Sequence, residues 1–272
     1  MIKLIAVDMD GTFLDEKSQY NRQRFYKIYN KLKDKGIRFV VASGNQYEQI
    51  ISFFKEIEDD LIIVSENGAL VRNKQTKFYH AAMPPEHYQF IVDWCQGFDD
   101  VEAVVNALHA SYVEEGYSKE AKEFAATYAY NLKEVTSLSA IDDTIFKACC
   151  HVPIEHLKDY IDDFNRRAPQ GLIAVKSGHA DMDMMIKGVN KATGLAHLLS
   201  LYGIRANELM TFGNSHNDLE MIQLAQYGFA MADADPEVVD AADYLAPSHC
   251  KEGVLEVLDA YLETGNIERF AK

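Results

Sequence analysis

The sequence Asp8-Met9-Asp10-Gly11-Thr12 directly follows the apolar run Leu4-Ile5-Ala6-Val7. A short apolar run that ends in a glycine turn is typical of a buried strand in a parallel sheet. Side chains two residues apart on a strand point the same way, so Asp8 and Asp10 can reach one small volume at the carboxyl end of the strand. Open α/β sheets bind ligands at that edge. The stretch therefore predicts an α/β fold with a functional pair of carboxylates.

The two carboxylates also predict a cation and a type of chemistry. Two anions this close repel each other unless a cation lies between them, and oxygen ligands favour Mg²⁺. In phosphoryl transfer one carboxylate can attack phosphorus while the other carries a proton. For the pentapeptide alone an ordinary turn is the alternative, because Asp and Gly are common turn residues.

Three later segments combine apolar or helical stretches with polar turns. Ser43, which follows a second apolar run, can present its hydroxyl and nearby backbone N–H groups to a phosphate. Lys191 can neutralise a phosphoryl oxygen, and Asn214 and Asp218 place an amide and a carboxylate four residues apart. Each segment alone also has an ordinary explanation as a turn serine, a solvated lysine or a helix-capping acid. The segments are residues 40–45, 188–194 and 209–218.

The order of these four segments resembles the haloacid dehalogenase superfamily. Asp8-Met9-Asp10-Gly11-Thr12 corresponds to motif I, Ser43 to motif II, Lys191 to motif III and residues 213–218 to motif IV. Motif I lies too close to Ser43 for an inserted domain, whereas the long interval before Lys191 has room for one. This spacing resembles the type II, Cof-like branch, and residues 65–69 and 230–236 agree with it. Within the branch the chain is most similar to bacterial sugar phosphatases of the SupH/YbiV type.

The resemblance implies a Rossmann-like parallel-sheet core with an inserted α/β cap domain. We expect the core at residues 1–83 and 187–272 and the cap at residues 84–186, entered at Pro84-Pro85. The remaining expected elements follow from apolar patterning. Core strands are expected at 4–7, 39–42, 61–64, 209–212 and 229–231, a helix at 21–35 and a hairpin turn at Lys74-Gln75. Cap helices are expected at 86–95, 119–130 and 155–167, and cap strands at 102–106, 145–152, 172–176 and 182–186.

The resemblance also implies a role for each residue of the site. Asp8 is the expected nucleophile, Asp10 the acid and base, and Ser43 and Lys191 hold the phosphoryl oxygens. Lys187 is an alternative to Lys191. The expected Mg²⁺ ligands are Asp8, Asp10, Asn214 and Asp218, and Asp218 can instead orient Lys191. The expected substrate-binding residues are Thr12, Gly44, Asn45, Asn67, Asn217, His179 and Asp183, with Ser177 and Asp181 as further cap candidates.

Three positions depart from the family pattern. Asn214 stands where Asp is usual, so it keeps an oxygen ligand but removes a negative charge from the metal site. Asn45 replaces an arginine that is common in the wider family, although the sugar phosphatases share this Asn. Ala232-Asp233 stands where Gly-Asn is usual, and the sequence assigns no consequence to it.

Composition limits the class of partner. A net charge of −15 over 272 residues argues against binding to nucleic acid or to an anionic membrane, and no apolar stretch approaches the length of a membrane span. We expect a cytoplasmic protein, a monomer or weak homo-oligomer, that acts on a small phosphorylated substrate. The four cysteines lack metal-ligand spacing and are expected to be buried, reduced thiols.

Two other functions fit the same motifs. A regulatory or metabolite-binding protein with weak turnover is favoured by Asn214, but the remaining catalytic residues argue against it. A phosphomutase uses similar carboxylates, and the absence of an early cap argues against the familiar small-sugar mutases.

Overall fold

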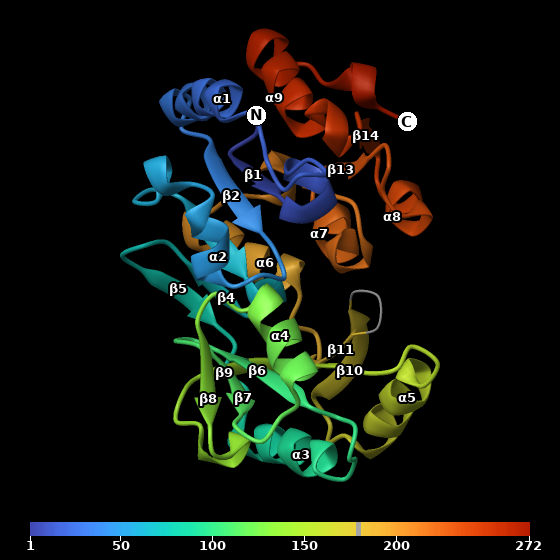
Figure 1. The fold of residues 1–272 in the computed structure, drawn as a ribbon. Coiled ribbons are helices and arrows are strands. Elements are labelled where there is room, and N and C mark those ends of the chain that lie inside the picture. Colours follow the sequence, from blue (N-terminus) through green and yellow to red (C-terminus); the bar gives the residue numbers. More distant parts are fainter. Residues whose placement is uncertain (178–180) are drawn as a thin grey trace. The chain divides into compact units, whose positions relative to one another are not determined.

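The computed structural model describes residues 1–177 and 181–272, which divide into two compact units (Figure 1). The core unit comprises Met1–Tyr79 and Asn190–Lys272, and the inserted unit comprises His80–Val189. The inserted unit thus begins slightly before and ends slightly after the expected range of residues 84–186.

The core unit contains one mostly parallel sheet with the strand order β14-β13-β12-β1-β2-β3-β4-β5 (Figure 1). The central strand β1 pairs in parallel with β12 on one side and with β2 on the other, so Val7 lies opposite both Phe212 and Val41. β4 is antiparallel to β3. The strands are β1 Leu4–Val7, β2 Arg38–Ala42, β3 Ile62–Ser65, β4 Leu70–Arg72, β5 Lys77–His80, β12 Leu209–Gly213, β13 Tyr227–Met231 and β14 Tyr244–Ala246.

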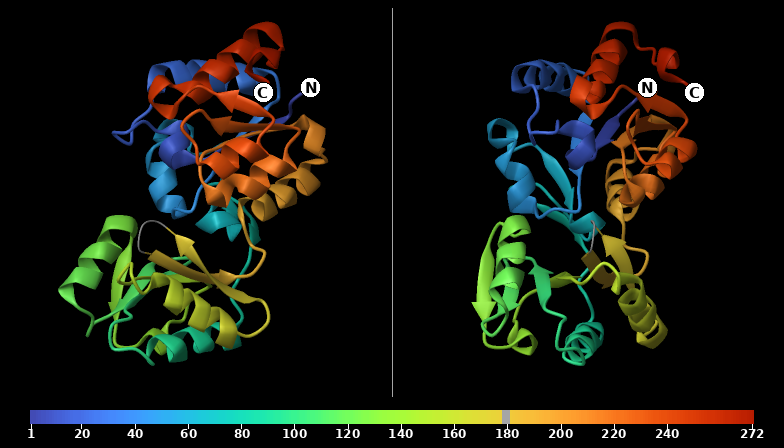
Figure 2. Two further views of the ribbon diagram at one scale, coloured as in Figure 1. Left: turned by 90° about the vertical axis from the view of Figure 1, so that its right-hand side faces the viewer. Right: turned by 45° about the vertical axis from the view of Figure 1, so that its right-hand side comes forward.

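Helices cover both faces of this sheet (Figure 2). Because alternate strand residues point to opposite faces, Leu4 and Ala6 share a buried cluster with Leu195 and Leu198 of α6. On the other face, Phe25 of α1 packs against Phe39 with ring centroids 5.1 Å apart. The helices of this unit are α1 Arg22–Asp34, α2 Tyr47–Ser52, α6 Lys191–Tyr202, α7 Leu219–Leu224, α8 Pro236–Ala241 and α9 Gly253–Thr264.

The inserted unit contains a second sheet with the strand order β10-β11-β9-β6-β7-β8. Helices α3 and α5 pack on one face around Trp94 and Phe164, and α4 packs on the other face beside Val104 and Val113. The strands are β6 Ala103–Ala107, β7 Ser111–Glu114, β8 Leu132–Val135, β9 Ile145–His151, β10 Leu172–Ser177 and β11 Asp181–Ile186. The helices are α3 Pro85–Cys95, α4 Lys119–Tyr128 and α5 Leu157–Arg167.

The cysteines depart from the expectation that all four are buried. Cys95 and Cys150 are buried, but Cys149 is partly exposed and Cys250 is exposed. Cys250 lies in the short helix η7 (His249–Lys251), which contains no buried residue. The pattern of apolar residues around a cysteine therefore does not decide its exposure in so short an element.

Candidate active site

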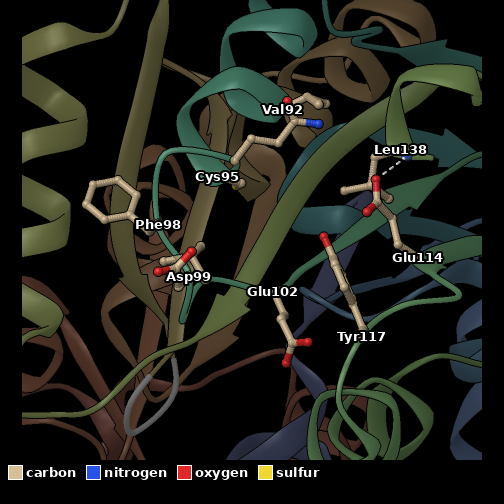
Figure 3. Close-up of a pocket in the computed structure, with 10 residues that line it drawn as sticks. Val92, Cys95, Phe98, Asp99, Glu102, Glu114, Tyr117 and Leu138 are labelled. Carbon is tan, nitrogen blue, oxygen red and sulfur yellow. Dashed lines mark hydrogen bonds between the residues drawn. The ribbon is translucent and has the colours of Figure 1, made fainter.

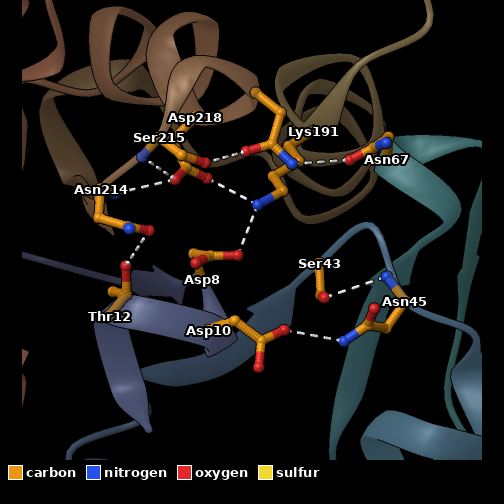
Figure 4. A network of polar contacts seen from close by, with 11 residues as sticks. Asp8, Asp10, Thr12, Ser43, Asn45, Asn67, Lys191, Asn214, Ser215 and Asp218 are labelled. Atoms are coloured by element: carbon orange, nitrogen blue, oxygen red, sulfur yellow. Dashed lines mark hydrogen bonds and ion pairs between the residues drawn. The ribbon is translucent and has the colours of Figure 1, made fainter. Parts of the chain in front are cut away.

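The polar residues of the four sequence motifs meet at the carboxyl ends of the core strands (Figure 4). Asp8 directly follows β1, and Ser43 directly follows β2. Asn214 directly follows β12, and Lys191 is the first residue of α6. Parallel pairing brings the ends of these strands to one edge of the sheet, so residues from distant parts of the chain become neighbours.

The ammonium group of Lys191 lies between two carboxylates. Its Nζ is 2.6 Å from Oδ1 of Asp8 and 2.7 Å from Oδ1 of Asp218. The Lys191 side chain is 1% exposed and the Asp218 side chain is fully buried. Asn190 fixes the start of α6 through a capping box with Thr193, which sets the position of Lys191. One buried cation therefore serves two buried anions.

Asp218 is held by protein donors on both oxygens. While Oδ1 faces Lys191, Oδ2 accepts hydrogen bonds from the backbone N–H groups of Asn214 at 2.9 Å and Ser215 at 3.1 Å. A Cβ at Gly213 would lie 2.4 Å from the Cβ of Asp218, so only glycine permits this approach. This arrangement makes Asp218 well suited to hold the ammonium group of Lys191 in position.

The charge balance of the site changes the pKa of Asp8. Burial and the nearby Asp218 carboxylate raise this pKa to about 7, against the opposing effect of Lys191. The pKa of Lys191 is itself raised, because its two anionic partners outweigh the cost of burying the ammonium. The site therefore has a surplus negative charge that a second cation, or a proton on Asp8, can neutralise.

The side-chain amide of Asn214 lies beside this surplus charge. With its oxygen toward the site, that atom is 3.0 Å from the backbone oxygen of Asp10 and 3.3 Å from Oδ2 of Asp8. It then accepts a hydrogen bond from the Thr12 hydroxyl at 3.1 Å. With the amide turned over, its nitrogen donates to those same oxygens instead. In the first orientation, the side-chain oxygen of Asn214, Oδ2 of Asp8 and the backbone oxygen of Asp10 lie together, and none of these three atoms is a hydrogen-bond donor.

Those three oxygens fit a divalent cation. Octahedral Mg²⁺ with bonds of about 2.0–2.1 Å separates adjacent ligand oxygens by roughly 2.9 Å, close to the distances at Asn214. A set of oxygen ligands also matches the preference of a hard cation. The residues that can hold Mg²⁺ are therefore Asp8, Asp10 through its backbone oxygen, and Asn214. Both oxygens of Asp218 already accept hydrogen bonds from the protein, so Asp218 is not needed as a direct ligand.

Asp10 points its carboxylate toward a different partner. Its Oδ2 accepts a hydrogen bond from the side-chain amide of Asn45 at 2.9 Å. The backbone N–H of Asn45 in turn donates to Oγ of Ser43 at 3.1 Å. Accepting this bond leaves the proton of the Ser43 hydroxyl to donate elsewhere. Asn45, which sequence analysis assigned to substrate binding, thus orients the carboxylate of Asp10 (Figure 4).

The remaining core residues surround the Ser43 turn. Asn217 donates its side-chain amide to Oδ1 of Asn67 at 3.0 Å. A Cβ at Gly44 would lie 3.0 Å from that Asn67 oxygen, so the turn and Asn67 pack closely. The structure therefore brings Gly44, Asn67 and Asn217 together beside Ser43. Lys187, the alternative to Lys191, is exposed and belongs to the inserted unit.

The cap candidates lie in the inserted unit. Asp183 is 3% exposed and pairs with Lys147 of β9, with Oδ2 and Nζ 2.9 Å apart. Oδ1 of Asp181 lies 2.7 Å from Nδ1 of His151. Ser177 of β10 is paired with Asp181 of β11 in the sheet. His179 lies outside the described residues. Lys147 was not predicted as a site residue; its signal is a charged side chain among the apolar residues of β9 (Ile145–His151).

An open pocket in the inserted unit is not suited to phosphate (Figure 3). Its lining includes the carboxylates of Asp99, Glu102 and Glu114, and the described lining residues contain no Lys, Arg or His. Glu114 accepts a hydrogen bond from the backbone of Leu138 at 2.8 Å. Anionic walls repel a phosphate, so the residues around Asp8 remain the candidate site.

The fold and the residues around Asp8 define a haloacid dehalogenase-type phosphatase. A family model described as haloacid dehalogenase-like hydrolase matches residues 5–258. The chain belongs to this superfamily, in its Cof-type branch. It is a phosphoric monoester hydrolase that acts on small phosphorylated compounds. Among the described residues, no helix combines the length and apolar character needed to cross a membrane.

Three relatives illustrate the similarity. The Escherichia coli (strain K12) protein named 5-amino-6-(5-phospho-D-ribitylamino)uracil phosphatase YbjI is 37% identical over 262 residues, covering 96% of this chain and 97% of that protein. SMU.1108c from Streptococcus mutans UA159 has a TM-score of 0.89 and 32% identity, covering 97% of this chain and 100% of that chain. The HAD subclass IIB sugar phosphatase BT4131 has a TM-score of 0.78, covering 95% and 98%, and its 21% identity shows the fold alone.

Proposed function

We propose that this chain is a Mg²⁺-dependent phosphatase that hydrolyses sugar phosphates and phosphorylated sugar alcohols through an aspartyl-phosphate on Asp8. The observation that carries the proposal is the position of Asp8, between the ammonium of Lys191 and the oxygen cluster of Asp10 and Asn214. A nucleophilic carboxylate needs a neighbouring cation on the phosphoryl group that it attacks, and this position supplies one from the chain itself.

In the first step, a carboxylate oxygen of Asp8 forms a bond to phosphorus as the bond from phosphorus to the leaving oxygen breaks. The carboxyl group of Asp10 donates its proton to that leaving oxygen, so an alcohol departs. Asn45 holds Asp10 in place through its hydrogen bond at 2.9 Å. Ser43 and Lys191 bind phosphoryl oxygens as negative charge develops on them.

In the second step, water attacks phosphorus and the bond to Asp8 breaks, which releases inorganic phosphate. The Asp10 carboxylate, now ionised, takes the proton of that water. Bound Mg²⁺ would neutralise charge on Asp8 and on the phosphoryl group. Asp218 keeps Lys191 oriented throughout, because both of its oxygens are held by this lysine and by backbone N–H groups.

The substrate class rests on two observations. The E. coli relative, 37% identical across nearly the whole chain, is named for a substrate that carries a phosphorylated ribityl group. In the inserted unit, Lys147 and Asp183 form a buried pair with donors and acceptors that suit hydroxyl groups. We therefore propose that Asp183 and Lys147 recognise the hydroxyls of a sugar or sugar alcohol. Thr12, Gly44, Asn67 and Asn217 remain candidate contacts of the phosphate.

A release assay for inorganic phosphate tests both the reaction and the substrate class. The compounds are p-nitrophenyl phosphate, hexose and pentose phosphates, a ribityl phosphate and a phosphopeptide, each with and without Mg²⁺. We expect Mg²⁺-dependent release from sugar and ribityl phosphates, abolished in Asp8→Ala and retained in the control Asp240→Ala, whose side chain is exposed. Preference for the phosphopeptide would contradict the substrate class, and parental activity in a folded Asp8→Ala protein would contradict the mechanism. Transfer between sugar positions without phosphate release would identify a mutase.

The same assay examines the pair in the inserted unit. Lys147→Met and Asp183→Asn should each raise the KM for sugar phosphates while changing the kcat for p-nitrophenyl phosphate little. Such a split is expected because that compound has no sugar hydroxyls to recognise. Equal loss with both types of substrate would show that the pair supports the fold only.

A further inference from the structure

A second group of metal-binding side chains lies in the core unit, apart from the residues around Asp8. Asp233 follows β13, and His249 and Cys250 belong to helix η7. One ligand atom from each of these three residues lies within 4.8 Å of the other two. Asp233 is also the position where the sequence departs from its family without an assigned consequence. The group therefore combines a carboxylate, an imidazole and a thiol at one place on the core.

The two ring nitrogens of His249 contact different partners. Nδ1 is 2.6 Å from Oδ2 of Asp233, whereas Nε2 is 3.3 Å from Sγ of Cys250. A histidine that ligates a metal commonly donates its other N–H to a carboxylate, which fixes the ring and its tautomer. Asp233 stands in that outer position, so Nε2 is the ligand atom of His249.

Glu16 adds a carboxylate oxygen beside the thiol. Sγ of Cys250 lies 3.3 Å from Oε1 of Glu16. A tetrahedral Zn²⁺ with bonds of about 2.0–2.1 Å to nitrogen or oxygen and about 2.3 Å to sulfur separates adjacent ligand atoms by roughly 3.5 Å. The distances from Sγ to Nε2 and to Oε1 both lie close to this value. The sulfur is thus as far from each of the other two atoms as one ligand of such an ion is from its neighbours.

The charge around Cys250 favours a cation over a reactive thiolate. Asp233 and Glu16 both place a carboxylate beside the His249–Cys250 pair. Two anions oppose the formation of a bare thiolate, so the arrangement does not suit a nucleophilic cysteine. A divalent cation reverses this balance, because it stabilises the thiolate and both carboxylates.

We propose that Glu16, His249 and Cys250 form a site for Zn²⁺ or another borderline-soft divalent cation, with Asp233 orienting His249. A water molecule can complete the coordination, since Cys250 is exposed. Glu16 follows η1 (Met9–Phe13), the segment that carries Asp10 and Thr12. The bound ion would therefore connect the segment after the catalytic turn to η7. This site is independent of the proposed Mg²⁺ site, whose ligands are all oxygens.

Cobalt substitution tests the site in the chain with both of its units. The protein is stripped of metal with a chelator and titrated with Co²⁺, while the near-ultraviolet charge-transfer band from thiolate to Co²⁺ is recorded. We expect the band to saturate at about one equivalent and to be removed by competing Zn²⁺. The Asp8 site cannot contribute to this signal because it contains no thiolate, so the result does not depend on phosphatase activity.

Variants then assign the band to named residues. Cys250→Ser is nearly isosteric and should abolish the band, whereas the control Cys149→Ser, a thiol in the inserted unit, should keep it. Asp233→Asn should weaken Co²⁺ binding by about 10- to 100-fold, the usual effect of losing a carboxylate behind a ligating histidine. Glu16→Gln should also weaken binding. Absence of a band in the parent protein, or an undiminished band in Cys250→Ser, would overturn the proposal.

Discussion

The ammonium of Lys191 lies 2.6 Å from a carboxylate oxygen of Asp8, and both side chains are buried. Asp218 shares the same ammonium. Lys191→Met therefore leaves two buried carboxylates without their cation. We expect the free energy of unfolding to fall by about 3–5 kcal/mol, as when one partner of a buried ion pair is removed. We also expect kcat to fall by at least about 100-fold. Urea unfolding and initial rates measure the two effects.

The double variant Lys191→Met with Asp218→Asn serves as the control for this prediction. Neutralising Asp218 removes one of the two stranded anions, so much of the lost stability should return while kcat stays low. If the double variant were no more stable than Lys191→Met, repulsion between the buried carboxylates would not be the cause of the loss.

The pKa of Asp8 makes Mg²⁺ and protons competitors. This pKa is raised to about 7 in the protein without a metal. Below that pH a cation must displace the proton, whereas above it the carboxylate is already ionised. The Mg²⁺ concentration for half-maximal rate should therefore fall as the pH rises, by up to about tenfold per unit below pH 7, and then level off. Rates measured over a Mg²⁺ series at each pH between 5.5 and 8.5 test this, and a constant Mg²⁺ requirement would contradict it.

Restoring the family's usual carboxylate at Asn214 should strengthen metal binding. The Asn214 side chain already faces Oδ2 of Asp8 and the backbone oxygen of Asp10. In Asn214→Asp a charged oxygen takes the same place, which is worth on the order of 1 kcal/mol or more at ligand distance even when screened. We expect the Mg²⁺ requirement to fall by roughly tenfold at pH 8. An unchanged or raised requirement would mean that the added anion raises the pKa of Asp8 instead and that the site is adapted to a neutral ligand.

Alanine substitutions at two glycines distinguish the effect of backbone strain from the effect of a displaced metal ligand. Gly11 and Gly36 both have positive φ, +74° and +70°. A Cβ at Gly11 would lie 2.5 Å from Nδ2 of Asn214, whereas a Cβ at Gly36 would meet nothing within 4 Å. Both alanine variants should lose about 1–2 kcal/mol of stability from the left-handed backbone.

Only Gly11→Ala should also raise the Mg²⁺ requirement, by about tenfold or more, because it displaces the Asn214 amide. Urea unfolding together with Mg²⁺ titration of the hydrolysis rate compares the two variants. Similar Mg²⁺ requirements in Gly11→Ala and Gly36→Ala would show that contact with Asn214 does not tune metal binding.

The core strands were predictable because fully buried strands consist of consecutive apolar residues. The run at residues 4–7 matches β1 (Leu4–Val7), since a central parallel strand is buried on both faces. Three strands were not predicted from the sequence: β7 (Ser111–Glu114), β8 (Leu132–Val135) and β14 (Tyr244–Ala246). β8 and β14 lie at the ends of their sheets, and none of the three is fully buried. β7 and β8 each include two polar or charged residues, and β14 has only three residues, so none of them forms an apolar run long enough to be recognised.

Residues that share a motif were predictable as a group, but their contacts were not. Motif order brought Asp8, Lys191 and Asp218 into one prediction, and the structure brings their side chains together. The bond from Asn45 to Asp10 was not predicted, because it depends on the rotamers of two turns. The Lys147–Asp183 pair depends on strand register in the inserted unit, which no single segment encodes.

The position of β1 between β12 and β2 also determines the order in which the core can be completed. β1 leaves the ribosome before its partner β12 (Leu209–Gly213), which is made only after the whole inserted unit. At synthesis rates of about 5–20 residues per second, this delay is on the order of ten seconds. Throughout that time one edge of the fully buried strand β1 has no native partner, and such edges promote association between chains. Nascent chains of this protein are therefore expected to need chaperone protection, whereas the inserted unit, made without interruption, can fold as it emerges.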